Sequence, residues 1–361
     1  MLVNRFLMNC NTHIVIMAGG IGSRFWPMST PEYPKQFVDV LGRGMSMIQM
    51  TVERFAPLCP IENMWVVTSA DYESLVREQL PQLPVENILL EPAMRNTAPC
   101  IAYACWKIRQ KNSDANVVVT PADALVVDVD DFRKVMARAL EFTSTGQRIV
   151  TVGIRPTRPE TGYGYIAAGE EVLCNENDGV KVLKVDSFRE KPALPVAKEY
   201  LAAGNYLWNA GIFVWNIATI VESLRSFVPD LASKMDQMAE SFYTDEEREK
   251  VGEIFPTCEK ISIDYAVMEK ADYIYTIPGD FGWSDVGTWG SLWTLLSHDE
   301  NGNAVVGENV HLNDCKGCIV HAPGAESVVL QGLEDSIVVE RDGRLLVCRL
   351  SEEQRITDFR K

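Results

Sequence analysis

The chain has 361 residues and a formal net charge of -16, from 34 Lys and Arg residues against 50 Asp and Glu residues. This acidic excess disfavours binding to nucleic acid and to anionic membrane surfaces, so basic residues inside a phosphate-binding motif would be conspicuous. Hydrophobic residues make up 47% of the chain, enough for one large α/β domain with an appendage. We find no apolar run of about 18 residues that would span a membrane and no recognisable signal peptide, and we therefore expect a cytoplasmic protein.

The nine cysteines are an odd number scattered over a long chain, which favours reduced thiols over a disulfide framework. Cys315 and Cys318 form a single C-x-x-C pair. A zinc site of the usual kind would need a second pair or a histidine pair at a suitable spacing, and neither follows. Two ordinary cysteines in a strand-rich region are the simpler interpretation, and zinc or redox chemistry is the alternative.

Short β-branched runs alternate with helical segments over the first 150 residues. Asn96 and Thr97 can cap a helix that carries Pro99 in its first turn. Strands separated by helices predict a Rossmann-like, mostly parallel sheet flanked by helices, in which ligands bind at the carboxyl ends of the strands. The predicted strands are residues 13–17, 64–68, 87–91, 116–120 and 148–153.

The pattern changes after residue 301, where short apolar runs follow one another without helical segments between them. Asp342-Gly343, which separates two of these runs, predicts a tight hairpin turn. We therefore predict a large α/β domain over residues 13–300 and a small all-β, β-helix-like domain over residues 301–361.

A glycine-rich loop, residues 19–22, directly follows the first predicted strand. Glycines at such a place let backbone N–H groups approach an anion closely. Arg24 and Lys35 lie downstream, and both reach a triphosphate if the proline-containing segment between them folds back. The loop lacks the Gly-Lys-Ser/Thr of a P-loop, and Phe25 stands where a dinucleotide fingerprint needs its third glycine. A structural turn with incidental basic residues is the alternative.

Two aspartates are candidates for a magnesium site. Asp123 follows the predicted strand 116–120, and Asp285 precedes a predicted helix. A carboxylate at the end of a strand can hold Mg²⁺ close to bound phosphates. The alternative for each residue is a turn or a helix cap, and one residue can serve both purposes.

Three further segments suggest a site for a sugar phosphate. Glu190 and Lys191 follow the predicted strand 180–188, where a lysine can neutralise a phosphate and a glutamate can accept hydrogen bonds from hydroxyls; a surface ion pair is the alternative. Asn209 lies in an apolar, aromatic segment and must be hydrogen-bonded if buried, either by the fold or by a ligand. Gly164, in Gly-Tyr-Gly-Tyr, allows close approach to the backbone.

Seven runs occur in a fixed order between residues 14 and 289, each of low specificity alone and highly specific together. Together they resemble the sugar-nucleotide pyrophosphorylase family, and within it the bacterial mannose-1-phosphate guanylyltransferases of the short form, without a phosphomannose isomerase domain. The strand-rich tail also resembles that family's C-terminal region. The runs are MAGGIGSRFWPMSTPEYPKQF, EPAMRNTAP, TPAD, ETGYGYI, FREKP, WNAGIF and GWSDVGTW.

The resemblance implies a nucleotidyltransferase fold and the conversion of GTP and mannose 1-phosphate into GDP-mannose and pyrophosphate, by in-line attack on the α-phosphate with Mg²⁺ as cofactor. We also expect a homodimer. Arg24, Lys35, Asp123 and Asp285 are then catalytic, with Mg²⁺ on the two aspartates. Glu91 is the candidate for guanine, because a carboxylate can accept from N1–H and the exocyclic amine together. The expected nucleotide-binding residues are Ala18, Gly19, Gly20, Gly22, Arg24, Lys35, Glu91, Asn96, Thr97 and Ala98, and the expected sugar-phosphate residues are Gly164, Glu190, Lys191 and Asn209.

One position departs from the family pattern, which usually has a histidine where this chain has Ala124. If that histidine helps to place metal or phosphate, the rate or the metal preference of this chain differs. Ala124 is also the one feature that points to an alternative, a catalytically weak relative that binds a sugar nucleotide and regulates a partner. A pyrophosphorylase for another base or hexose is a second alternative, independent of this position.

Overall fold

A computed structural model describes residues 10–174 and 179–359, and these residues form two compact units. The first unit contains residues 10–19, 52–121, 126–174 and 179–283, and the second contains residues 20–51, 122–125 and 284–359. The chain passes from one unit to the other within α1 (Met47–Phe55), β5 (Leu125–Val126) and β11 (Trp283–Ser284). The predicted domain boundary at residue 300 stays a prediction.

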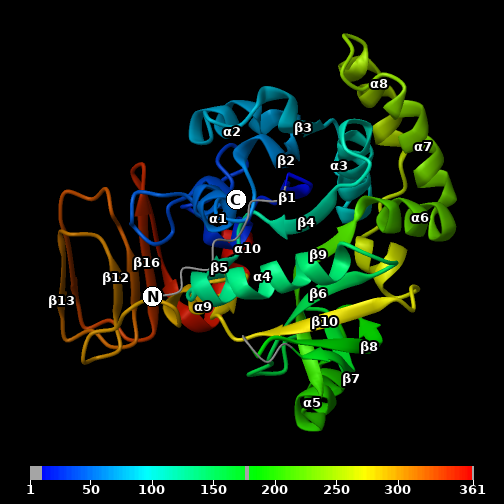
Figure 1. Cartoon of the computed structure of the whole chain (residues 1–361). Coiled ribbons are helices and arrows are strands. Elements are labelled where there is room, and N and C mark those ends of the chain that lie inside the picture. The colour runs from blue at the N-terminus through cyan, green and yellow to red at the C-terminus, as the bar shows by residue number, and fades with distance from the viewer. Residues whose placement is uncertain (1–9, 175–178, 360–361) are drawn as a thin grey trace, which may run out of the picture. The chain divides into compact units, whose positions relative to one another are not determined.

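The first unit is built on a nine-stranded mixed sheet (Figure 1). Only β8 and β9 run opposite to the other strands, since β9 pairs antiparallel with both β4 and β6, and β8 pairs antiparallel with both β10 and β7. The predicted Rossmann-like, mostly parallel sheet is therefore confirmed. Across the sheet the order is β3 (Ile88–Glu91), β2 (Met64–Ser69), β1 (Thr12–Ala18), β4 (Asn116–Pro121), β9 (Tyr206–Asn216), β6 (Ile149–Ile154), β10 (Ile274–Gly279), β8 (Lys181–Arg189) and β7 (Tyr165–Cys174).

Helices cover both faces of this sheet. On one face α3, α6 and α7 pack together, and their apolar side chains join Val15, Val117 and Trp215 in one buried cluster. On the other face α4 packs against β4, β6, β9 and β10. The helices of the unit are α2 (Glu73–Gln79), α3 (Thr97–Lys111), α4 (Val129–Thr143), α5 (Leu194–Ala203), α6 (Ile217–Phe227), α7 (Pro229–Ala239) and α8 (Glu247–Ile254).

The five strands predicted within the first 150 residues are all present, each within one residue of the predicted bounds. The helix predicted after residue 96 is α3, and the Asn96 side chain accepts a hydrogen bond from the Thr97 backbone N–H at 2.8 Å. That bond satisfies one of the backbone donors that a helix leaves free at its start.

The second unit contains short, mostly parallel strands, as a β-helix does, and the strand-rich C-terminal region is confirmed. Asp342 and Gly343 turn the chain between β16 and β17 with φ of 53° and 74°, the two positive values that a type I′ hairpin requires. The strands form two sheets, β12 (Ala304–Val306), β14 (Ile319–His321), β16 (Ser336–Arg341) and β17 (Arg344–Arg349) in one, and β13 (Val310–Asn313) and β15 (Val328–Gln331) in the other.

The core of the second unit joins its early and late segments. Phe25, Val38 and Met47 belong to the same buried cluster as Trp289 and Ile337. The glycine-rich loop and the C-terminal strands thus share one hydrophobic core. The remaining helices of this unit are the 3₁₀ turns Ser23–Phe25, Lys35–Phe37 and Leu350–Arg355, with α9 (Trp289–Trp293) and α10 (Ile356–Phe359).

No helix in the described parts of the chain is both long enough and apolar enough to cross a membrane.

Candidate active site

Lys35 is the centre of a charged cluster in the second unit. The residue is only 2% exposed, and its ammonium donates to the Asp123 carboxylate Oδ2 at 3.1 Å, to the Asp123 carbonyl at 3.0 Å and to the Asp285 carbonyl at 2.6 Å. An ammonium has three N–H donors, so these three oxygens match its capacity. The structure therefore brings together three of the four predicted catalytic residues, with Lys35 bound to the aspartate segments themselves.

The loop that carries Lys35 closes on itself at the glycines. The Lys35 backbone N–H donates to the Ile21 carbonyl at 3.2 Å, and the Ser29 hydroxyl donates to the Gly22 carbonyl. Gly22 has φ of 68°, and a Cβ there would lie 2.4 Å from the Lys35 Cβ, which no side chain tolerates. Glycine at position 22 is thus required by both the backbone conformation and the lysine stem.

The aspartate at position 285 is held by strained backbone. Val286 is fully buried and has φ of 44°, which is a real outlier for a β-branched residue. The Asp285 Oδ1 accepts from the Gly287 N–H at 3.1 Å, and the Ser284 hydroxyl accepts from the Val286 N–H at 3.1 Å. Strain of this kind persists where the surroundings over-determine a residue, and it is frequent at functional sites.

Two residues of the glycine-rich segment face solvent. Arg24 and Gly20 are exposed, and in the described part of the chain Arg24 makes no ion pair. An exposed guanidinium next to a glycine-rich loop can receive a phosphate without first breaking an internal contact.

In the first unit, Glu91 lies beside the end of β1. A Cβ on Gly19 would lie 3.5 Å from the Glu91 carboxylate Oε2, so that carboxylate is next to the backbone that follows Ala18. Burial raises the pKa of Glu91 to about 7. A half-buried carboxyl poised near neutrality is the kind of group that accepts or releases a proton on ligand binding.

Asn96, Thr97 and Ala98, the three predicted nucleotide-binding residues at the start of α3, have different environments. The Thr97 hydroxyl accepts from the Ile263 N–H at 2.9 Å, and the Ala98 N–H donates to the Ile261 carbonyl at 3.1 Å. These two residues therefore hold the helix against the 261–263 segment. Asn96 is exposed and adopts φ of 69°, so it is the member of the trio that presents polar atoms to solvent.

The predicted sugar-phosphate residues are brought together in the first unit. A Cβ on Gly164 would lie 2.6 Å from the Glu190 carboxylate Oε2 and 3.4 Å from the Asn209 Cβ. The Asn209 backbone N–H donates to the Gly164 carbonyl at 2.8 Å, and the Lys191 N–H donates to the Tyr163 carbonyl at 3.2 Å. The Lys191 ammonium pairs with Glu190 at 3.0 Å, but the lysine side chain stays 61% exposed while that of Glu190 is only 10% exposed.

The Asn209 amide has a fixed orientation. Its Oδ1 accepts from the Thr151 hydroxyl at 2.9 Å and from the Gly211 N–H at 3.1 Å, and its Nδ2 donates to the Asp264 Oδ1 at 3.1 Å. The fold therefore satisfies the oxygen and one N–H of the amide, as the first of the two alternatives expects, and a contact of Asn209 with a ligand stays a prediction.

Asp264 is a site residue that the sequence analysis missed. It begins a π-helical turn (Asp264–Met268), an element that is frequent at functional sites. Burial, and then the nearby Glu190 carboxylate, raise the pKa of Asp264 to about 7. The sequence did offer a signal for Asp264, because it is an acidic residue among apolar neighbours, with Ile263 before it and Ala266 and Val267 beyond Tyr265. A polar residue in an apolar segment is the same signal that identified Asn209.

The matching family model, described as nucleotidyl transferase, covers residues 13–302. A curated mannose-1-phosphate guanylyltransferase from Salmonella montevideo is 40% identical over 92% of this chain and 70% of its own length. The chain belongs to the mannose-1-phosphate guanylyltransferase family of nucleotidyl transferases. A second curated mannose-1-phosphate guanylyltransferase, from Escherichia coli K12, is 37% identical over 96% of this chain and 72% of its own length.

A solved structure supports the same fold over nearly the whole chain. The Thermus thermophilus protein described as a mannose-1-phosphate geranyltransferase has a TM-score of 0.86 and 32% identity, and the match covers 97% of this chain and 98% of that one. The nucleotidyltransferase fold and the strand-rich C-terminal region therefore occur together in a relative of similar length.

The donor set fits a magnesium ion that is shared with a substrate. In proteins Mg²⁺ is usually held by one or two carboxylates together with phosphate oxygens, and it keeps several waters. Asp123 and Asp285 supply two carboxylates on segments that one lysine joins, and the Asp123 side chain is 40% exposed. Within residues 10–174 and 179–359 no group of three or more His, Cys, Asp or Glu side chains could hold a metal ion without further ligands.

Proposed function

We propose that this chain transfers the guanylyl group of GTP to mannose 1-phosphate and so forms GDP-mannose and pyrophosphate. A phosphate oxygen of the sugar attacks the α-phosphorus of GTP, the new P–O bond forms in line, and the bond to pyrophosphate breaks. The cluster of Lys35, Asp123 and Asp285 in a member of this family is the observation that carries the proposal. Transfers of this kind depend on positioning and charge neutralisation more than on covalent help from the protein.

The phosphates of GTP are assigned to the glycine-rich loop and its two cations. Backbone N–H groups of residues 18–22, notably Gly19, Gly20 and Gly22, cradle the phosphates, and Arg24 neutralises the leaving pyrophosphate. Lys35 contributes its charge to the same phosphates, and it also fixes the segments of Asp123 and Asp285, which its ammonium already contacts.

Asp123 and Asp285 are the residues that would hold Mg²⁺. A bound Mg²⁺ would supply charge neutralisation at the phosphates, as metals do in phosphoryl and nucleotidyl transfer. The protein holds the Asp123 carboxylate through Lys35 and the Asp285 carboxylate through the Gly287 N–H, beside the strained backbone at Val286.

Mannose 1-phosphate is assigned to the set around Gly164. The exposed Lys191 neutralises the sugar phosphate, while Glu190 and Asn209 bind hydroxyls of the hexose. The absence of a side chain at Gly164 lets the Glu190 carboxylate lie against the backbone, since a Cβ there would lie 2.6 Å from the Glu190 Oε2. The Asp264 carboxyl keeps the Asn209 amide in one orientation.

The base of GTP is assigned to Glu91, whose ionised carboxylate accepts from two guanine N–H groups, with Asn96, Thr97 and Ala98 at the base or ribose. Because its pKa is raised to about 7, Glu91 loses its charge as the pH falls through that value. We therefore expect the KM for GTP to rise more steeply below pH 7 for the wild-type chain than for Glu91→Gln, which is neutral at every pH.

Steady-state kinetics of both proteins between pH 5.5 and 8.5 check this expectation. The γ-phosphate of GTP titrates in the same range for both proteins, so only the ratio of the two KM values is informative. A ratio that stays constant over the whole range contradicts the assignment of Glu91.

The experiment that tests the function is a substrate panel. Release of pyrophosphate is measured for each pairing of GTP, ATP, UTP, CTP and dTTP with mannose 1-phosphate and glucose 1-phosphate, with and without magnesium. We expect the highest kcat/KM for GTP with mannose 1-phosphate and a loss of activity without the metal. A higher value for another pair would reassign the base or the hexose, and no turnover with tight GDP-mannose binding would favour a regulatory relative with Ala124 as its altered position.

Three expectations about the cellular context belong to the same proposal. They are a cytoplasmic location, a homodimer, and no nucleic-acid partner. The net charge of -16 supports the last of these, because it opposes association with a polyanion. Sedimentation of the purified chain tests the homodimer.

A further inference from the structure

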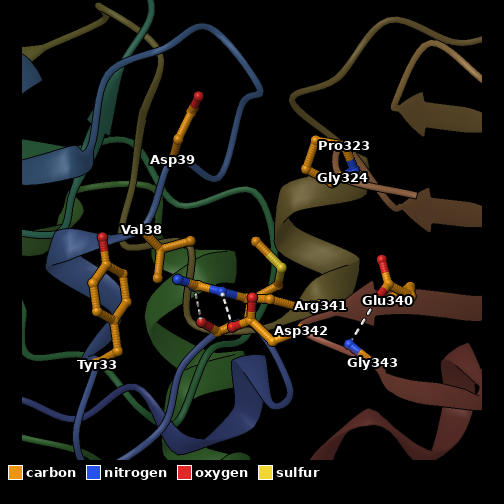
Figure 2. Close-up of a pocket in the computed structure, with 10 residues that line it drawn as sticks. Tyr33, Val38, Asp39, Pro323, Gly324, Glu340, Arg341, Asp342 and Gly343 are labelled. Carbon is orange, nitrogen blue, oxygen red and sulfur yellow. Dashed lines mark hydrogen bonds and ion pairs between the residues drawn. The ribbon is translucent and has the colours of Figure 1, made fainter. Parts of the chain in front are cut away.

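A cavity of about 510 Å³ lies in the second unit, outside the set of proposed active-site residues. Figure 2 shows Tyr33, Val38 and Asp39 on one side of it and Pro323, Gly324 and the hairpin residues 340–343 on the other. The segment that ends at Lys35 therefore borders a cavity, where apolar packing is incomplete. Phe25, Met28 and Val38 anchor the segment in the hydrophobic core, and polar contacts cross the region that borders the cavity.

Arg341, at the end of β16, makes such contacts with both parts of the Met28–Tyr33 turn. Its Nη1 donates to the Met28 carbonyl, and its guanidinium lies 4.4 Å from the centre of the Tyr33 ring (Figure 2). Its Nε pairs with Asp342 at 3.3 Å, and the arginine side chain is only 24% exposed. A planar guanidinium suits this arrangement, because it donates hydrogen bonds in its own plane while its face stacks on an aromatic ring.

The braced turn leads directly to Lys35. Thr30 and Tyr33 exchange two backbone hydrogen bonds, of 3.0 and 3.2 Å, which close the turn. Only Pro34, with φ of -64°, separates Tyr33 from Lys35. A displacement of the Tyr33 ring is therefore transmitted to the lysine over a stiff connection.

We propose that Arg341 is a positioning residue for binding of the nucleotide phosphates, because it braces the Met28–Tyr33 turn and so fixes Lys35 on Asp123 and Asp285. The proposal rests on the proposed function, since it takes Lys35 as part of the phosphate site. According to this proposal, the hairpin of β16 and β17 contributes indirectly to nucleotide binding.

The test compares Arg341→Gln and Tyr33→Leu with a matched control, Arg344→Gln, whose arginine is exposed on the same hairpin. We expect Arg341→Gln to raise the KM for GTP about tenfold, since the charge-assisted hydrogen bond to the Met28 carbonyl and the cation–π contact with Tyr33 are both lost. Tyr33→Leu loses only the cation–π contact and should raise this KM by a smaller factor. The KM for mannose 1-phosphate stays at the wild-type value in all three. The double variant should bind GTP no more weakly than Arg341→Gln alone, because the cation–π contact that Tyr33→Leu removes is already lost in Arg341→Gln.

Amide hydrogen exchange of the full chain without substrates gives a second readout that does not depend on activity. We expect faster exchange over residues 21–38 in Arg341→Gln and unchanged exchange there in Arg344→Gln. Unchanged exchange over these residues in Arg341→Gln would overturn the proposal. It would also be overturned if the KM values for both substrates rose in proportion to a fall in the thermal midpoint of unfolding, because that result indicates a purely structural role. If the wild-type chain turns over no pair of substrates, the proposed function fails, and the exchange experiment alone decides whether Arg341 braces the turn.

Discussion

Lys35→Met is expected to lower kcat/KM for GTP and mannose 1-phosphate by about 10²–10³-fold, the usual cost of removing one preorganised electrostatic group. The buried ammonium holds the Asp123 carboxylate and the backbone of Asp285 in one place. Without it, the Asp123 carboxylate loses its cation, the Asp285 carbonyl loses its hydrogen-bond donor, and the phosphates lose one positive charge. The measurement is the steady-state release of pyrophosphate.

Lys35→Arg is not expected to restore the rate. The lysine stem lies against Gly22, where even a Cβ would clash with it, and the ammonium lies 5.5 Å from the centre of the Phe25 ring. A larger, planar guanidinium does not fit that space or the three oxygens around the ammonium. Lys316→Met, at an exposed lysine of the same unit, is the control and should keep the wild-type rate. Turnover by Lys35→Met within a few-fold of the wild-type value would contradict the central place given to this lysine.

Asp285→Asn should lower kcat by about three orders of magnitude, because a metal that neutralises phosphate charge contributes several kcal/mol and each 1.4 kcal/mol is tenfold in rate. The asparagine Oδ1 can still accept from the Gly287 N–H, so the local turn is kept and only the charge is removed. We also expect half-saturation of the reaction at a higher magnesium concentration. A titration of the initial rate with magnesium at saturating substrates checks both effects.

The control for this substitution is Asp358→Asn, an exposed aspartate of the same unit, which should leave the rate and the magnesium dependence unchanged. The thermal midpoint of unfolding of Asp285→Asn, measured without magnesium, distinguishes a loss of metal binding from a loss of fold, because only a loss of fold lowers it under that condition. If the variant keeps the wild-type magnesium dependence, Asp285 is not a metal ligand. Its side chain then serves only to stabilise the turn before α9, by accepting from the Gly287 N–H.

The position of the glycine-rich loop was predictable because it follows from local rules. An apolar β-branched run that ends in glycines is a strand followed by an open turn, and β1 ends at Ala18, one residue after the predicted end. The hairpin at Asp342 and Gly343 follows equally from local conformation, since these residue types tolerate positive φ. The polar residues at the ends of predicted strands were found for the same reason.

Other features could not be predicted from the pattern of residues. Residues 207–213 attract attention for Asn209 alone, yet they belong to β9, which runs antiparallel between β4 and β6. The polar amide and Gly211, with φ of 70°, interrupt the apolar alternation that identifies a strand. The strain at Val286 is also invisible, because nothing in its local sequence favours a left-handed conformation.

The sequence by itself determined where the glycines, the cations and the carboxylates stand along the chain, and its resemblance to one family determined the reaction to expect. Only the tertiary structure decided that the Lys35 ammonium is directed at Asp123 and Asp285, which are 88 and 250 residues further along the chain. It likewise decided that Asp264 orients Asn209 and that Arg341 braces the turn before Lys35. Backbone sterics and capping act over a few residues, and so they can be inferred from a short stretch of sequence. Contacts between distant residues depend on strand order and on a shared core, which no single segment encodes.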